Sequence, residues 1–105
     1  MNNTKNAVQD TVLEMVSYKI KSDHLAVLPD SLDAARKELE NMEGFVSYKT
    51  MKSAKHSRTF IDVVEWENLE AAENAASKVM QTSGFKKFSE AIEEVITFNH
   101  FNFYH

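Results

Sequence analysis

The chain has 105 residues, of which 43% are hydrophobic, and this length and apolar content suit one compact domain with a single core. Its 16 acidic and 12 basic residues give a net charge of −4 without a long run of one sign, which argues against a nucleic-acid partner. Cysteine is absent, which excludes disulfides and thiolate sites, and no apolar run is long enough for a signal sequence or a membrane span. A soluble, cytoplasmic protein is expected.

The first segments in chain order are a polar tail and a strand. Residues 1–9 carry too little apolar surface to offset the entropy of ordering, so we expect a flexible tail before a single domain at residues 10–105. In residues 12–20, apolar side chains occupy both parities of an alternating pattern: Val12, Val16, Tyr18 and Ile20 on one, and Leu13 and Met15 on the other. This pattern predicts a strand with both faces buried.

A helix is predicted next, because apolar side chains recur at three- and four-residue steps from Leu25 to Met42, with Ser22 available as its N-cap. Pro29 interrupts this pattern. We favour a helix that is kinked at Pro29, and the alternative is a helix that begins only at Asp30 or Ser31.

The second half of the chain predicts three strands and two helices. Gly44 suits a left-handed helix cap, and residues 45–51 alternate as a strand that a polar hairpin loop joins to another strand at residues 59–66. Asn68 can cap an alanine-rich helix, and Ser83 and Gly84 restart a short helix. An aromatic-rich last strand is expected at residues 95–104.

This order is the ferredoxin-like βαββαβ arrangement of the α+β class, with a four-stranded antiparallel sheet whose helices cover one face. The third strand nevertheless has apolar side chains on both faces, with Ile61 and Val63 opposite Phe60, Val64 and Trp66. A sheet with one wet face would alternate apolar with polar residues. A second copy of the chain is the simplest cover for the other face, so a homodimer is predicted.

The segment Asp62-Val63-Val64-Glu65-Trp66, followed by the helix at residues 69–76, resembles the strand, tryptophan and helix signature of the antibiotic biosynthesis monooxygenase family. Residues 43–45 and 99–101 fit the same pattern, and the resemblance covers about residues 11–104. It implies a dimeric α+β barrel in which two sheets pack face to face, with a separate pocket between the sheet and helices of each subunit. Members include oxygenases that need no metal or flavin, haem-degrading enzymes and proteins without an assigned activity.

Two candidate site residues lie on the third strand. Asp62 shares its parity with Val64 and Trp66, and a carboxylate in such an apolar setting would have a raised pKa and could act as a base. The alternative for Asp62 is a carboxylate that only makes structural hydrogen bonds. Trp66 could form a pocket wall or donate its indole N–H, or it could be a core side chain.

His100, within the aromatic last strand, is the other candidate acid or base, unless it lies at the dimer interface as a satisfied polar residue. Met15 and Phe88 are expected to line the pocket with Val64 and Trp66. No spacing of histidines or carboxylates favours a metal site, and no cofactor is expected.

The leading hypothesis is a cofactor-independent monooxygenase that acts on a small aromatic substrate, such as a quinol or an anthrone. The rival is a non-catalytic or stress-related dimer that holds a small apolar or aromatic ligand. Pocket size discriminates between ligand binding and a filled core, because neither function is plausible if Leu13, Met15, Leu39, Val64 and Phe88 fill the space. A haem binder that uses His100 is a third possibility. The haem-degrading branch of the family uses an Asn on the first strand, a Trp at the end of the third strand and a His ligand near the second helix. Only Trp66 matches here, because the Asn position falls near Met15 and the His position near Ser89, so the resemblance disfavours haem degradation.

Overall fold

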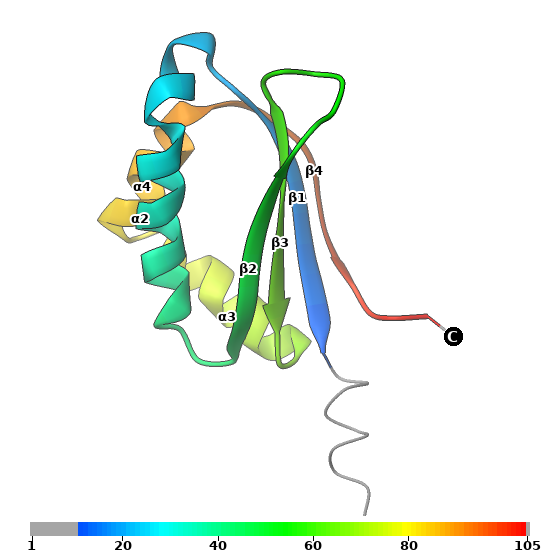
Figure 1. Cartoon of the computed structure of the whole chain (residues 1–105). Coiled ribbons are helices and arrows are strands. Elements are labelled where there is room, and N and C mark those ends of the chain that lie inside the picture. The colour runs from blue at the N-terminus through cyan, green and yellow to red at the C-terminus, as the bar shows by residue number, and fades with distance from the viewer. Residues whose placement is uncertain (1–10, 105) are drawn as a thin grey trace, which may run out of the picture.

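A computed structural model describes residues 11–104, which form one antiparallel sheet with helices on a single face (Figure 1). The strands are β1 (Val12–Ile20), β2 (Phe45–Lys52), β3 (Thr59–Trp66) and β4 (Ile92–Phe101). The helices are the 3₁₀-helix η1 (Ser22–Val27) and the α-helices α2 (Leu28–Glu40), α3 (Leu69–Val79) and α4 (Ser83–Ala91). With the strand order β2-β3-β1-β4, the predicted ferredoxin-like α+β fold is confirmed. The expected tail, residues 1–9, lies outside the described residues.

The register of the central strand β1 decides which side chains face the helices. Glu14 is paired with Val64 on β3 and with His100 on β4, and Val16 is paired with Asp62. Since side chains alternate across a strand, the even-numbered residues of β1 and β3 point toward the helices. We call this side of the sheet the inner face and the opposite side the outer face.

The preferred interpretation of Pro29 is wrong. Residues 22–27 form η1, and α2 begins at Leu28 with Pro29 in its first turn, so no kinked helix runs from Ser22 to Met42. Proline suits this position because its ring fixes φ near the helical value, and an N–H in the first turn would have no intrahelical acceptor. Ser22 caps nothing, since the residue that precedes η1 is Lys21, without a side-chain cap.

Local signals later in the chain are confirmed. The Asn68 side chain accepts a hydrogen bond from the Ala71 N–H at 2.8 Å and so caps α3. Gly44 has a φ of 85°, the left-handed conformation expected of it. β4, however, begins at Ile92 and ends at Phe101, so it lies three residues earlier than expected.

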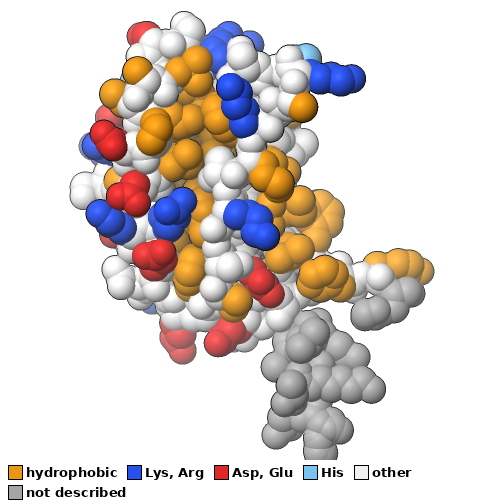
Figure 2. Space-filling model, viewed as in Figure 1, with side chains coloured by type: hydrophobic (Ala, Val, Ile, Leu, Met, Phe, Trp, Pro, Cys, Tyr) orange, Lys and Arg blue, Asp and Glu red, His pale blue; other side chains and the backbone are white. Residues whose placement is uncertain are grey.

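The core lies between the inner face and the helices, in two clusters. One contains Tyr18, Ile20, Leu28, Ala35, Phe88 and Ala91, and the other contains Val64, Trp66, Ala72 and Ala75. The alanines of α3 allow this helix to pack closely against the strand that carries Trp66. Along the seam between helices and sheet, Figure 2 shows hydrophobic side chains bordered by charged ones.

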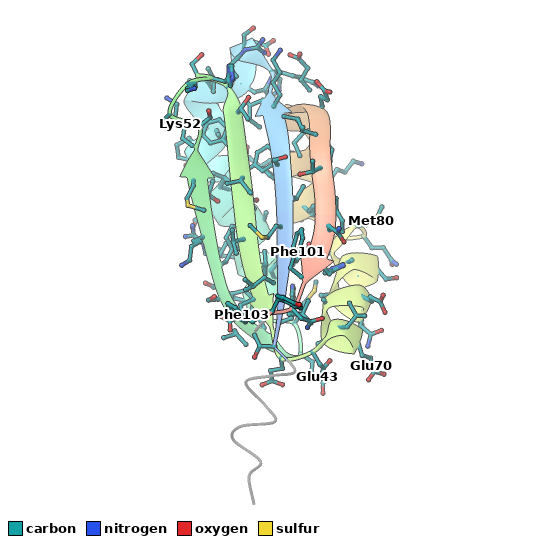
Figure 3. All side chains as sticks on the ribbon, turned by 90° about the vertical axis from the view of Figure 1, so that its right-hand side faces the viewer. Glu43, Lys52, Glu70, Met80, Phe101 and Phe103 are labelled. Carbon is teal, nitrogen blue, oxygen red and sulfur yellow. The ribbon has the colours of Figure 1, made fainter. Side chains whose placement is uncertain are left out.

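No helix within residues 11–104 covers the outer face, as Figure 3 shows from that side. Its apolar side chains include Leu13, Met15, Met51, Ile61, Val63 and Phe101, and Met51 and Phe101 are 48% and 46% exposed. A shallow hollow on this face is lined in part by Met15, Ile61 and Phe101. The described part of the chain therefore leaves an apolar sheet face without a cover.

Candidate functional site

A cavity of about 140 Å³ lies between the inner face and the helices. The helices contribute only apolar side chains to its wall: Ala35, Leu39, Ala76, Val79, Phe85 and Phe88. The strands contribute the rest, namely Glu14, Val16, Tyr18, Tyr48, Asp62, Val64, Trp66, Ile92, Val95 and Phe98. All ionisable groups of the cavity wall therefore come from the sheet.

Asp62 is buried at 2% exposure and is held by three hydroxyl groups. Tyr18 and Thr50 donate to its Oδ1 at 2.6 Å and 2.8 Å, and Tyr48 donates to its Oδ2 at 2.6 Å. Burial raises the pKa of Asp62, and these hydrogen bonds oppose the rise. Both carboxylate oxygens are thus engaged as acceptors.

Tyr18 and Tyr48 remain donors at neutral pH. Burial, followed by the charge of Asp62, raises the pKa of each phenol well above its ordinary value. The Arg36 guanidinium lies 5.5 Å from the centre of the Tyr48 ring, close enough for a cation–π contact. These contacts fix the tyrosines around Asp62.

A second polar group joins Glu14, Trp66 and His100. The Trp66 Nε1–H donates to Glu14 Oε1 at 3.0 Å, and His100 Nε2 lies 3.7 Å from the same oxygen. Burial raises the pKa of Glu14, while the nearby His100 and the Trp66 N–H oppose this rise. The His100 Nε2 atom is buried and makes no hydrogen bond among the described residues.

Of the expected pocket residues, Trp66, Val64 and Phe88 line the cavity together with Asp62. Met15 does not, because as an odd-numbered residue of β1 it lies on the outer face, paired with Val63. Leu13 shares that parity, so these two side chains cannot fill the inner space. The expectation that Met15 belongs to the pocket is wrong.

Glu14 is the site residue that the sequence analysis missed. Its signal was present, since Glu14 has the parity of Val12, Val16 and Tyr18, the more apolar side of the first strand. The reasoning that singled out Asp62 applies to Glu14 in the same way. Its contact with His100, in contrast, depends on the pairing of β1 with β4, which the sequence pattern does not specify.

The cavity does not fit a haem. A macrocycle of four pyrrole rings is far larger than about 140 Å³, a volume close to that of cavities that hold a single benzene ring. Among residues 11–104, no group of three or more histidine, aspartate or glutamate side chains could hold a metal ion.

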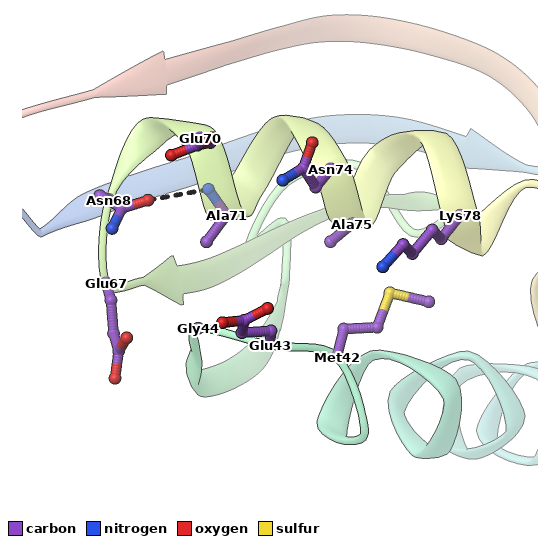
Figure 4. A pocket seen from close by; sticks show the side chains of 10 residues that line it. All are labelled: Met42, Glu43, Gly44, Glu67, Asn68, Glu70, Ala71, Asn74, Ala75 and Lys78. Atoms are coloured by element: carbon purple, nitrogen blue, oxygen red, sulfur yellow. Dashed lines mark hydrogen bonds between the residues drawn. The ribbon is translucent and has the colours of Figure 1, made fainter.

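A second hollow, of about 210 Å³, lies between α3 and the turn that leads into β2 (Figure 4). Its charged side chains, Glu43, Glu67, Glu70 and Lys78, are all exposed. Because none of them is buried or held by a partner that would perturb it, this hollow lacks the features of a chemical site. We assign no role to it.

The chain has the antiparallel βαββαβ fold, and an apolar cavity lies under its helices. These two features place it in the class of ferredoxin-like α+β proteins with a pocket between the sheet and the helices. The model of the antibiotic biosynthesis monooxygenase family matches residues 11–91, so the chain belongs to this family. Among curated proteins, none matches the sequence significantly.

Solved structures share the fold at low sequence identity. A conserved protein from Methanosarcina mazei Go1 is 13% identical with a TM-score of 0.72, and the match covers 93% of this chain and 97% of that one. A proposed antibiotic biosynthesis monooxygenase from Bordetella bronchiseptica is 17% identical, with a TM-score of 0.75 and coverages of 92% and 100%. SnoaB, a cofactor-independent oxygenase from Streptomyces nogalater, is 15% identical, with a TM-score of 0.66 and coverages of 91% and 93%.

No helix within residues 11–104 is long and apolar enough to cross a membrane.

Proposed function

We propose that this protein is a cofactor-independent monooxygenase that acts on a one-ring phenol or quinol bound beside Trp66. The observation that carries the proposal is an apolar cavity with a buried carboxyl group, Asp62, and a partly buried one, Glu14, on its sheet-side wall. Family membership supports monooxygenase chemistry, and a structural neighbour, SnoaB, is a cofactor-independent oxygenase.

The size of the cavity favours a single ring over the fused rings of an anthrone. Its volume of about 140 Å³ resembles that of an engineered cavity, roughly 150 Å³, that binds benzene. Phe98 on the wall is 52% exposed, so the cavity is open along β4 and ring substituents can extend there.

The proposed reaction begins when a base on the wall takes the phenol O–H proton. The electron-rich phenolate then reduces dioxygen and forms a carbon–oxygen bond at its para carbon, and the returning proton gives a hydroperoxide. For a phenol whose para carbon carries a hydrogen, loss of that hydrogen as a proton breaks the O–O bond, so one oxygen atom enters a quinone and the other leaves as water. The protein favours deprotonation and excludes bulk water with its apolar walls.

Oxygen uptake over a panel of one-ring methoxyphenols and quinols, with an anthrone for comparison, tests this proposal. We expect turnover of one-ring phenols and much slower turnover of the anthrone. Asp62→Asn and Trp66→Phe should slow turnover, because they disturb the wall of the cavity. Equal rates for these proteins and for buffer would remove the proposal.

The second candidate function is ligand binding without turnover. It is favoured by the hydrogen bonds that already occupy both oxygens of Asp62, since a carboxylate so engaged is a poor base. Calorimetric binding of one-ring phenols without oxygen uptake by any of them would support it over the oxygenase.

We further propose that the outer face packs against the outer face of a second copy. An uncovered apolar sheet face is unusual on a monomer, and a self-complementary face produces a two-fold dimer. In such a dimer the two cavities stay separate, because each lies on the other side of its own sheet.

A further inference from the structure

Glu14 is the carboxyl group of the cavity that keeps an oxygen free. It is the third residue of β1 and lies on the inner face, its side chain is 15% exposed, and it lines the cavity. Its Oε1 accepts the hydrogen bond from Trp66 and faces His100. Its Oε2 accepts no hydrogen bond from the described residues, so a new donor would displace no existing hydrogen bond at this oxygen.

Asp62 differs in this respect. Its oxygens accept three hydrogen bonds from Tyr18, Tyr48 and Thr50, at 2.6 to 2.8 Å. Three of the roughly four acceptor positions of this carboxylate therefore already hold a donor, and the remaining one lies on the oxygen that Tyr48 occupies. A proton on Glu14 Oε2 displaces no donor among the described residues.

We infer that Glu14 accepts the proton of the bound phenol at its Oε2, and that Trp66 and His100 are positioning residues that hold Oε1. This inference rests on the proposed function, because it assigns the base of that reaction. The O–H bond of the phenol breaks, an O–H bond forms on Glu14, and the electron pair stays on the phenolate oxygen. The cavity holds the same net charge before and after this step.

The surroundings of Glu14 suit a base. Its charged or polar neighbours come from the strands: Asp62 and Trp66 on β3 and His100 on β4. The helices present only apolar side chains to the cavity. Burial raises the pKa of Glu14, which strengthens it as a proton acceptor, while His100 and the Trp66 N–H oppose the rise and favour the ionised form.

The test uses para-nitrophenol, a one-ring phenol whose para carbon is blocked against oxygenation and whose absorbance distinguishes phenol from phenolate. Bound to the wild-type protein at a pH below its own pKa, it should show the phenolate spectrum. Glu14→Gln should bind it as the neutral phenol. The matched control is Glu65→Gln, the same change on the outer face, and it should keep the phenolate signal.

A phenolate signal that survives in Glu14→Gln, or one that disappears in Asp62→Asn alone, would overturn the assignment. Absence of the phenolate spectrum from the wild-type complex would overturn it as well.

The positioning roles have a separate readout. Trp66→Phe removes the N–H donor, so the pKa of Glu14 should rise and the fraction of bound ligand that gives the phenolate spectrum at a given pH should increase. His100→Gln should change this fraction in the same direction. A purely structural role would weaken binding without changing this fraction, and unchanged fractions in both variants would refute the positioning role.

The outcomes for the base and for the oxygenase are distinguishable. If no phenol supports oxygen uptake but the phenolate signal follows Glu14, the oxygenase proposal fails and the proton acceptor stands. If uptake occurs and Glu14→Gln retains the wild-type rate, the proton acceptor fails and the oxygenase stands.

Discussion

At Asp62, three hydroxyl donors compensate for the burial of a carboxyl group in the middle of the sheet. Two of these donors are tyrosines on neighbouring strands, so this one side chain ties β1, β2 and β3 together through hydrogen bonds as well as through the backbone ladder. Such contacts contribute to stability mainly because an unsatisfied buried group is costly.

Tyr48→Phe should lower the free energy of unfolding by about 1.5 to 3 kcal/mol, because it removes a hydrogen bond to a buried charged group. Urea unfolding followed by circular dichroism measures this change. The matched control is Tyr104→Phe, which removes the same hydroxyl from a residue that is 99% exposed and should have an effect below about 0.5 kcal/mol. Similar losses in both variants would contradict the role of the Asp62 cluster.

The pH dependence of stability should also change at Asp62. Its pKa is raised on folding from an ordinary value of 3.8, so its contribution is complete below that pH and is lost as the pH rises through the raised pKa. Asp62→Asn removes this contribution, and its unfolding free energy should fall less steeply than that of the wild type as the pH rises from about 4 toward neutrality.

The exposed Asp23 and Glu93, whose pKa values are lowered, and Glu14, whose pKa is raised, are present in both proteins, so the difference between the two curves reports on Asp62 and its effect on Glu14. Parallel curves for the wild type and Asp62→Asn would show that the pKa of Asp62 is not raised in the folded protein.

Among the elements, α3 is positioned by a close approach at its N-terminal end. Gly44 adopts a φ of 85°, and a Cβ atom added to it would collide with the Ala71 Cβ. The turn before β2 therefore packs directly against the first turns of α3, and only glycine satisfies both the conformation and the space.

Gly44→Ala should destabilise the protein by at least about 2 kcal/mol, through the strained backbone and the collision. Ala71→Gly alone should cost up to about 1 kcal/mol as a glycine within a helix. In the double variant the collision is absent, so its loss of unfolding free energy should be smaller than the sum of the two single losses. Strict additivity would show that the two residues do not collide.

Elements whose bounds depend on a local residue pattern or on a single capping side chain were predictable from the sequence. The bounds of β3 and the cap of α3 by Asn68 depend on alternation and on one side chain, and both were predicted correctly. The region of Pro29 was not, because a proline sterically fits either a kink or a first turn, and the packing of the residues around it decides between them.

Part of the candidate site was also predictable, because the positions of some of its residues follow from alternation along a single strand. Trp66 and Asp62 share one strand, so their common face follows from parity alone. Met15 was misassigned because β1 is apolar on both parities, and only its pairing with β3 shows which side faces the helices. The contact of Glu14 with His100 joins residues far apart in sequence and follows from the strand register.

At the scale of the whole molecule, the two faces of the sheet have different roles in this account. The inner face encloses the cavity and its ionisable groups, whereas the outer face is apolar and is covered by none of the described helices. A charged side chain introduced on the outer face should therefore affect assembly without disturbing the core.

Wild-type protein should sediment as a dimer at micromolar concentration, and Val63→Lys should sediment as a folded monomer, because a buried lysine without a partner is costly at an interface. Ser89→Lys adds the same charge at an exposed position of α4 and should remain dimeric. Monomeric wild-type protein, or a dimer that tolerates Val63→Lys, would contradict the assignment of the outer face.

The central claim is that the cavity beside Trp66 oxygenates a one-ring phenol, and the stoichiometry of the reaction tests it most directly. Dioxygen consumed and quinone formed should be equal for an electron-rich phenol with a free para carbon, without accumulation of hydrogen peroxide. Glu14→Gln should slow this reaction about 100-fold or more, the usual contribution of a general base. Uptake no faster than in buffer, or one peroxide released for each dioxygen consumed, would contradict the account.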